Sequence, residues 1–295
     1  MKLSIIIVSY NTKALLHHCL DSLKPQLNSQ TEVIIIDNAS TDGSVQAIQE
    51  AFPKVKLIAN KRNLGFAAAT NLGIKKTSAT YVLLLNPDTL VQPGSLTLLT
   101  DYLDAHPQVA IASPKLLNPD GSLQPAGGAL PNLNNLTTWF FLLDHLPYVG
   151  EFIDPYHQNH QDFYTKTQLT GWVPGTAMII RRKVLDQIGL LDDQIFMYAE
   201  DVDLCLRAHQ TDHQVALLPQ ATVIHASHAA AGKPKALIGE VDGLKYLFAK
   251  YKPAWQQLLL RLVFKKGALI RMLLFATIAR DKTRYDTYQK IFNLA

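Results

Sequence analysis

The run Leu3-Ser4-Ile5-Ile6-Ile7-Val8-Ser9 stands near the start of the chain and is followed at once by the polar pair Tyr10-Asn11. Consecutive β-branched and apolar residues without polar alternation are typical of a strand buried on both faces of a parallel sheet. Residues 12–27 then show helical spacing, and a second apolar run, 33–36, leads into Asp37-Asn38. The order strand, helix, strand predicts a βαβ unit.

The same alternation continues through the first 115 residues. Further strands are expected at 55–59, 81–85 and 109–112, and helices at 44–51, 63–76 and 95–105. This pattern predicts an α/β fold of the Rossmann-like kind, with a mainly parallel central sheet and flanking helices.

The middle of the chain is different in composition. Residues 114–170 are rich in Pro, Gly, Asn and Gln and show little periodicity, so we expect a functional excursion there. Beyond it we expect strands at 172–181, 215–218 and 222–225 and helices at 184–188 and 201–209.

Composition excludes several classes of protein. The chain has 295 residues, of which 48% are hydrophobic, and only two cysteines, Cys19 and Cys205. An apolar fraction of this size excludes a disordered chain, and two cysteines exclude a disulfide scaffold or a cysteine-based zinc cluster. We expect a reduced, cytosolic compartment, no signal peptide and no membrane-spanning segment.

The charge is unevenly distributed along the chain. Residues 1–232 carry 15 Lys/Arg and 20 Asp/Glu, a net −5, whereas residues 233–295 carry 13 and 4, a net +9. Within the basic tail, residues 254–280 show apolar side chains at helical spacing interleaved with cations. Such a helix either lies in a membrane interface or packs on the core of the protein itself. Nucleic-acid binding is not expected, because the cations alternate with an apolar stripe and not with stacking aromatics.

Polar residues follow the expected strands where ligands of open α/β sheets bind, at the carboxyl ends. Asp37 could accept hydrogen bonds from a base or a ribose, or it could form a turn. Asp88, in Asn86-Pro87-Asp88, could hold Mg²⁺ or Mn²⁺, and a turn is again the alternative. His225 also ends an apolar run and could complete such a metal site.

An acidic pair, Glu200-Asp201, precedes an expected helix. Acids in the first turn of a helix favour its dipole, which is the structural interpretation, and Asp203 and Arg207 are spaced to pair on one face. The apolar residues before the pair also fit a shaped general base, because burial tunes a carboxylate. Neither Gly-x-Gly-x-x-Gly nor a P-loop motif occurs, which argues against a dinucleotide dehydrogenase or a P-loop enzyme.

Taken together, these segments resemble glycosyltransferase family 2, with the GT-A fold, and within it the bacterial rhamnosyltransferase-like branch. The resemblance covers residues 3–228. It rests on these blocks, in the order of the family: Val8-Ser9-Tyr10-Asn11, Asp37-Asn38-Ala39-Ser40-Thr41-Asp42-Gly43-Ser44, Asn63-Leu64-Gly65-Phe66-Ala67 with Asn71, Asn86-Pro87-Asp88, Gly175-Thr176-Ala177, Phe196-Met197-Tyr198-Ala199-Glu200-Asp201-Val202-Asp203-Leu204-Cys205 with Arg207, and His225.

The resemblance implies a role for each matching position. Asp37 would contact the base of a nucleoside-diphosphate sugar, Asp88 and His225 would bind a divalent cation, Mn²⁺ or Mg²⁺, and Asp201, next to Glu200, would be the catalytic base. The remaining donor-binding positions would be Ser9, Tyr10, Asn11, Asn38, Arg62, Asn63, Gly65 and Asn86, and the acceptor side would be Trp172, Gly175 and Thr176.

The resemblance also implies domains and partners. Residues 1–232 would form the GT-A domain, with 1–115 as the donor half and 116–232 as the acceptor and catalytic half. Residues 233–295, which the resemblance does not cover, would be a basic amphipathic helical tail on the strength of their own charge and apolar spacing. The donor would be dTDP-rhamnose or a UDP-sugar, and the acceptor a glycan or a lipid-linked glycan of a cell-surface polysaccharide. The protein would be cytoplasmic and peripheral on the inner face of the plasma membrane, with membrane contact through 254–280 and an oligomer possible.

Two departures and two alternatives accompany this interpretation. Asn86 stands where the family has the first acid of its Asp-x-Asp pattern, and Ala226-Ser227-His228-Ala229 replaces the Gly and Ser that many relatives carry after His225.

A nucleotidyltransferase would need a Gly- and basic-rich loop after the first strand, where this chain has Ser9-Tyr10-Asn11-Thr12. A sugar-binding scaffold with a degenerate site is the non-enzymatic alternative, and the acids Asp37, Asp88 and Asp201 argue against it.

Overall fold

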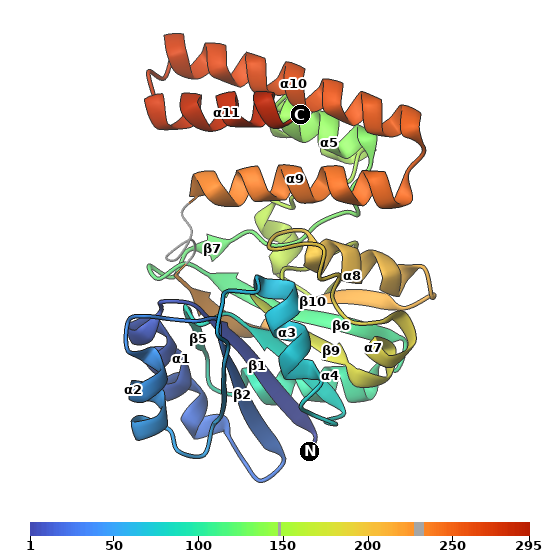
Figure 1. Cartoon of the computed structure of the whole chain (residues 1–295). Coiled ribbons are helices and arrows are strands. Elements are labelled where there is room, and N and C mark those ends of the chain that lie inside the picture. The colour runs from blue at the N-terminus through green and yellow to red at the C-terminus, as the bar shows by residue number, and fades with distance from the viewer. Residues whose placement is uncertain (147–148, 227–232) are drawn as a thin grey trace. The chain divides into compact units, whose positions relative to one another are not determined.

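The computed structural model describes residues 1–146, 149–226 and 233–295 and divides into two compact units (Figure 1). The sheet unit comprises Met1–Gly127 and Asn159–Ala230, and the helical unit comprises Gly128–Gln158 and Ala231–Ala295. The expected division between 232 and 233 placed residues 128–158 with the sheet, whereas their contacts group them with the C-terminal helices.

The first half of the sheet is parallel and carries the strands expected from the sequence. Strands β1 (Leu3–Ser9), β2 (Thr31–Asp37), β3 (Lys56–Ala59) and β4 (Tyr81–Leu85) lie in the order β3-β2-β1-β4. The register pairs Ser9 with Asp37 across β1 and β2, and Ile7 with Leu85 across β1 and β4. The polar residues that follow these strands therefore meet at one edge.

The second half of the sheet mixes directions. Strand β9 (Ala177–Arg181) runs antiparallel between β4 and β6 (Val109–Leu117), and β10 (Gln214–His225) continues the sheet parallel to β6. The short strands β5 (Thr89–Val91), β7 (Leu123–Gln124) and β8 (Gln168–Thr170) pair antiparallel with β10, β6 and β10. The two strands expected at 215–218 and 222–225 are one strand, β10, because a register shift accommodates Pro219 without ending it.

Helices cover both faces of the sheet. Their bounds are α1 (Lys13–Leu23), α2 (Ser44–Ala51), α3 (Phe66–Ile74), α4 (Ser95–Ala105), α7 (Arg182–Ile188) and α8 (Glu200–His209), with 3₁₀ turns at Lys24–Gln26 and Gln161–Tyr164. Leu20 of α1, Ile48 of α2 and Leu99 of α4 share one core cluster with Ile5 and Ile7. Residues alternate between the two faces of a strand, and Ile6 accordingly faces α3 on the other side. The expected α/β fold with a mainly parallel sheet is confirmed.

The helical unit is built around a long helix, α10 (Ala254–Thr277). It packs with α5 (Leu133–Phe140), α9 (Lys233–Tyr251) and α11 (Lys282–Leu294), and the short helices Leu143–His145 and Val149–Phe152 complete the unit. The tilted rings of Phe140 and Phe264 pack with centroids 4.5 Å apart, and Arg271 donates hydrogen bonds to the carbonyls of Trp139 and Phe140. These contacts are why residues 128–158 belong with the tail. Among the described residues, no helix has the length and apolarity needed to cross a membrane.

The close approach of α3 to β1 yields a stability prediction. A Cβ at Gly73 would lie 2.5 Å from Cγ2 of Ile6. Helix propensity alone favours Ala over Gly by about 1 kcal/mol, but overpacking a core costs about 1–3 kcal/mol. Gly73→Ala should therefore lower Tm by several degrees, as measured by differential scanning calorimetry.

A matched control is Gly175→Ala, whose added methyl would meet Phe66 at 3.4 Å, an ordinary contact. The control should leave Tm nearly unchanged. A higher Tm for Gly73→Ala would show that this packing is looser than described.

Candidate active site

The site lies along the carboxyl edge of the parallel strands. The backbone N–H of Asn38 donates to the carbonyl of Ser9 (2.7 Å), and the N–H of Asn60 donates to the carbonyl of Asp37 (2.8 Å). Past β4, the N–H of Asn86 donates to the carbonyl of Thr176 (2.9 Å). Backbone hydrogen bonds thus align the carboxyl ends of β1, β2, β3 and β4 with the start of β9.

Asp37 carries a carboxylate oxygen that lacks a partner. The residue is 2% exposed, and its Oδ2 accepts a hydrogen bond from the N–H of Ser40 (2.9 Å). Among the described residues its buried Oδ1 has no hydrogen-bond partner. Buried acceptors are nearly always satisfied, so this oxygen points to a ligand that supplies an N–H or O–H group.

The loop after β1 is clamped to the loop after β2. Asn11 adopts a left-handed conformation (φ +53°), which Asn tolerates better than most residues. Its N–H donates to Oγ of Ser40, and its side-chain oxygen accepts from the N–H of Thr41. Tyr10 is left 48% exposed beside this clamp. Of the two predicted donor contacts, Tyr10 is free to meet a ligand, whereas the amide of Asn11 holds the loops together.

Ser9 and Asn38 were predicted to bind the donor, but both side chains lie inside the protein. Oγ of Ser9 is 2.8 Å from the hydroxyl of Thr12. The amide of Asn38 donates to the carbonyl of Gly65 (3.0 Å) and accepts from the amide of Asn60 (2.9 Å). These residues shape the loops around Asp37, and Arg62 and Asn63 lie exposed at the rim.

Gly65 joins the donor-side loops to the segment before α8. It has φ +83°, and a Cβ there would lie 2.5 Å from the carbonyl oxygen of Phe196. The next N–H, of Phe66, donates to that carbonyl (2.8 Å). Only glycine fits this close approach, which explains the residue without any contact to a ligand.

Two strained residues lead into the acidic pair. Tyr198 and Ala199 both have positive φ (+74° and +75°), an uncommon conformation for residues with a Cβ. This bend places Asp201 in the first turn of α8, where a carboxylate is stabilised by the helix dipole. Oδ2 of Asp201 accepts the N–H of Gly175 (2.9 Å), and Oδ1 accepts the N–H of Val202 (2.8 Å).

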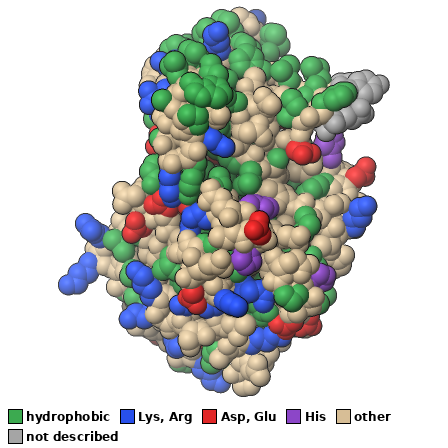
Figure 2. Space-filling model, turned by 90° about the vertical axis from the view of Figure 1, so that its right-hand side faces the viewer, with side chains coloured by type: hydrophobic (Ala, Val, Ile, Leu, Met, Phe, Trp, Pro, Cys, Tyr) green, Lys and Arg blue, Asp and Glu red, His purple; other side chains and the backbone are tan. Residues whose placement is uncertain are grey.

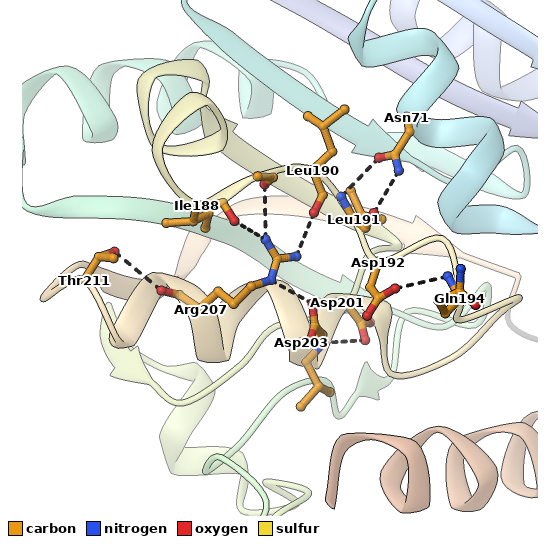
Figure 3. A network of polar contacts seen from close by, with 12 residues as sticks. Asn71, Ile188, Leu190, Leu191, Asp192, Gln194, Asp201, Asp203, Arg207 and Thr211 are labelled. Atoms are coloured by element: carbon orange, nitrogen blue, oxygen red, sulfur yellow. Dashed lines mark hydrogen bonds and ion pairs between the residues drawn. The ribbon is translucent and has the colours of Figure 1, made fainter. Parts of the chain in front are cut away.

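The position of α8 depends on Arg207 (Figure 3). Its Nε donates to the buried carboxylate of Asp203 (2.8 Å), and its terminal nitrogens donate to the carbonyls of Ile188 (2.7 Å) and Leu190 (2.8 Å). Asn71 of α3 exchanges two hydrogen bonds with the backbone of Leu191 (2.8 and 3.1 Å). The network ties α8 to the 188–191 segment and that segment to α3, so the first turn of α8 is held in place.

Glu200 is buried beside Asp201. It is 5% exposed, and its Oε2 has no hydrogen-bond partner among the described residues. Burial, together with the Asp201 carboxylate, raises the pKa of Glu200 to about 8. Glu200 is therefore protonated at neutral pH, and Asp201 is the member of the pair that faces the acceptor-side residue Gly175.

Asp88 and His225 lie together at the other end of the edge. Nε2 of His225 is 3.3 Å from Oδ1 of Asp88, and both side chains are about nine-tenths buried. Nδ1 of His225 is 2.7 Å from Oε1 of Gln124, whose amide nitrogen donates to Asn118 (2.9 Å) and to the His225 carbonyl (3.3 Å). Because that Gln124 oxygen can only accept, Nδ1 carries the proton and Nε2 is directed to Asp88.

This pair has the chemistry of a divalent-cation site. A carboxylate and an imidazole oriented through its second nitrogen are typical metal ligands. Among the residues that the structure describes, no group of three His, Cys, Asp or Glu side chains could hold an ion. Asp88 and His225 fit a cation that takes its other ligands from a bound anion and water. His228 lies outside the described residues.

Gln124 was absent from the sequence-based candidates. It lies in the two-residue strand β7, within the aperiodic 114–170 stretch, and is 101 residues from His225 in the chain. No local pattern marks it. On the acceptor side, Trp172 is buried, whereas Thr176 is half-buried beside Asn86.

The comparisons with known proteins bear on the fold and the family of the chain. The chain superposes on a mannosyltransferase from Pyrobaculum calidifontis solved with GDP-Man and Mn²⁺ (TM-score 0.60, 16% identity, 98% of this chain and 84% of that one). It also superposes on GalNAc-T7 solved with UDP, GalNAc and Mn²⁺ (TM-score 0.63, 14% identity), of which it spans 56% while 99% of this chain is covered. These likenesses establish the glycosyltransferase GT-A fold.

The family model "Glycosyl transferase family 2" matches residues 4–189, and the chain belongs to this family of glycosyltransferases. An N-acetylglucosaminyl-diphospho-decaprenol L-rhamnosyltransferase of Mycobacterium tuberculosis is 27% identical over 96% of both chains. A low-salt glycan biosynthesis hexosyltransferase of Haloferax volcanii is 26% identical over 77% of this chain and 66% of its own. The expected resemblance to the rhamnosyltransferase-like branch is confirmed.

The Arg207 network yields a second prediction. Arg207→Met would leave the Asp203 carboxylate buried without its cation, which costs about 3 kcal/mol or more. The free energy of unfolding in urea should fall by that amount. Lys24→Met, which breaks the exposed pair with Asp21, is the control and should cost less than about 1 kcal/mol. Equal losses in the two variants would contradict this assignment.

Glu200 yields a prediction for pH dependence. Its folded pKa of about 8 lies above its ordinary value of 4.5, so the folded protein retains a proton that the unfolded chain releases between these values. The free energy of unfolding should therefore fall as pH rises through this window. Glu200→Gln removes the effect. The Tm of the variant minus the Tm of the wild type should therefore rise by a few degrees from pH 5 to pH 8.

The control is Glu50→Gln, on the exposed side of α2, which should show no such trend. A Tm difference independent of pH in Glu200→Gln would show that Glu200 is ionised throughout.

Proposed function

We propose that this glycosyltransferase transfers a sugar from a nucleoside-diphosphate donor to an acceptor hydroxyl in one displacement, with inversion at the anomeric carbon. One observation carries the proposal. An unbroken series of contacts leads from Asp201 to Gly175, and from the adjacent Thr176 to Asn86, two residues before Asp88. The candidate base and the candidate diphosphate site are thus built on one edge of the sheet.

The nucleotide end of the site would accept uracil or thymine. The unpartnered, buried Oδ1 of Asp37 needs a donor, and both bases can supply one from the N–H group on their pairing edge. The rhamnosyltransferase from Mycobacterium tuberculosis, similar over nearly the whole chain, supports dTDP-rhamnose as the donor. A UDP-hexose or UDP-N-acetylhexosamine is the second candidate.

Asp88 and His225 would hold a divalent cation, Mn²⁺ or Mg²⁺. When bound, such an ion neutralises the negative charge that builds on a departing diphosphate. Gln124 would keep Nε2 of His225 available, because its Oε1 accepts the hydrogen bond that the other ring nitrogen, Nδ1, donates. Asn86 in place of an acid leaves Asp88 as the carboxylate at this position, so the protein contributes little negative charge against the diphosphate.

Asp201 would act as the general base. Two backbone N–H groups, of Gly175 and Val202, fix the orientation of its carboxylate. It would accept the proton of the acceptor hydroxyl as that oxygen forms its bond to the anomeric carbon and the bond to the diphosphate breaks. Glu200, protonated at neutral pH, would adjoin the base without competing for the proton.

The acceptor would be a glycan or a lipid-linked glycan in the synthesis of a cell-surface polysaccharide. Support comes from the Mycobacterium tuberculosis relative, whose name states a diphospho-decaprenol acceptor. Gly175 and Thr176 would border it, beside Asp201. A lipid-linked acceptor would place the enzyme on the cytoplasmic face of the plasma membrane.

Donor binding and turnover should respond differently to the two acids. With Mn²⁺ present, calorimetry across dTDP-rhamnose, UDP-glucose and UDP-N-acetylglucosamine should select one donor. Asp88→Asn should weaken its binding about tenfold or more, because a charged ligand of the cation is lost. Asp201→Asn should bind it normally and lose about 10²–10⁴-fold in turnover.

Asp186→Asn, an exposed position on α7, is the control and should change neither quantity. If no sugar nucleotide binds the wild type, the proposed transfer is wrong. If Asp201→Asn retains full turnover, Asp201 is not the base.

A further inference from the structure

Helix α10 carries a second apolar face that the described part of the chain leaves exposed. Its inner face, with Leu260, Phe264 and Ala268, is fully buried. Seven other large apolar residues on the helix are 42–61% exposed. At about 100° per residue they fall within one arc about 120° wide, centred opposite the buried face. They form what we call the outer stripe: Trp255, Leu258, Leu259, Leu262, Leu269, Ile270 and Leu273.

The stripe runs almost the full length of the helix. From Trp255 to Leu273 the helix rises by 18 residue steps, or about 27 Å at 1.5 Å per residue. Scattered exposed apolar residues are normal on a protein surface, but seven large ones on one face of one helix are typical of an interaction site. Figure 2 shows hydrophobic side chains gathered over the C-terminal helices, with Lys and Arg among them.

The charges on α10 itself are all positive. No Asp or Glu occurs between Asp242 and Asp281, while that interval contains eight Lys and Arg residues. Four of the cations on or just beyond α10 are exposed, namely Arg261, Lys265, Lys266 and Arg280. Lys266 lies within the arc of the stripe itself. A second copy of this face would bring like charges together, whereas an anionic surface complements it.

The C-terminal end of α10 adds a polar feature of the same kind. A hollow of about 320 Å³ lies where α10 leads into α11, and its lining includes Arg280 and Lys282 beside two aromatic rings, Phe275 and Tyr285. Among the residues that the structure describes, no acid lines this hollow. Cations next to aromatic rings suit the boundary between lipid phosphates and acyl chains.

We propose that α10 is an interfacial membrane anchor, whose outer stripe lies among the headgroups and upper acyl chains of a bilayer that contains anionic phospholipid. The inner face packs on α5 and α11, so the helix meets lipid on one side and lies parallel to the membrane surface. Arg261, Lys265, Lys266 and Arg280 contact lipid phosphates. The inference rests on the helical unit alone and does not depend on the donor or the acceptor proposed above.

Vesicle flotation of the full-length protein tests the anchor. Vesicles of phosphatidylcholine with about one third phosphatidylglycerol should bind it about tenfold or more tightly than pure phosphatidylcholine, and added salt should weaken the binding. The exposed Trp255 should shift its fluorescence to shorter wavelength on binding. Lys265→Gln with Lys266→Gln should reduce binding to the anionic vesicles about tenfold.

The apolar part of the contact is tested by a matched pair of variants. Leu258→Gln with Leu273→Gln removes two exposed leucines from the stripe, and Leu98→Gln with Leu169→Gln removes two comparably exposed leucines from the sheet unit. The first variant should lose about tenfold or more in vesicle affinity, and the second should keep it. Both should retain the wild-type circular dichroism and donor binding in solution.

Three outcomes would overturn the proposal. One is that the wild type does not float with anionic vesicles. Another is that the two leucine variants lose vesicle affinity equally. The third is that light scattering finds a dimer that only Leu258→Gln with Leu273→Gln dissociates, which would assign the stripe to a second copy of the chain.

Discussion

The in-register pairing of β1 with β2 and with β4 is the constraint on which the site depends. Because Ser9 pairs with Asp37 and Ile7 with Leu85, three strands end at the same edge, and the loops that follow them lie side by side there. The apolar side chains on both faces of β1 hold this register, because a slip by one residue would exchange its two buried faces. The pairing of buried strands thus brings Asp37 and Asn86 to this edge, and Oδ2 of Asp37 adds a hydrogen bond from the N–H of Ser40.

The antiparallel strand β9 extends the edge to the catalytic side. Its start is tied to β4 through Thr176 and Asn86, and the preceding residue, Gly175, holds Asp201. Arg207, through Asp203, and the left-handed residues Tyr198 and Ala199, which precede the helix, then fix the first turn of α8. The backbone strain lies next to Asp201, and the hydrogen bond from the N–H of Phe66 to the carbonyl of Phe196 holds the segment that leads into it.

Much of the fold could be predicted from the sequence because its signals are local. The strands at 3–9 and 81–85 and the helices at 44–51 and 95–105 have the predicted bounds. Long-range contacts escaped prediction: residues 128–158 join the tail through aromatic packing, and Gln124 reaches His225 across the sheet. Ser9 and Asn38 show a related limit, since a sequence places a polar residue at a strand end without telling whether it faces a ligand or a neighbouring loop. The roles of the remaining site residues stay predictions.

The central claim is that Asp88 and His225 supply only part of a cation site, which a nucleoside diphosphate completes. Electron paramagnetic resonance of Mn²⁺ titrated into the protein, with and without dTDP, measures this coupling. The account predicts that dTDP raises the affinity for Mn²⁺ about tenfold or more and, by reciprocity, that Mn²⁺ raises the affinity for dTDP by the same factor. Equal Mn²⁺ binding with and without dTDP would contradict it.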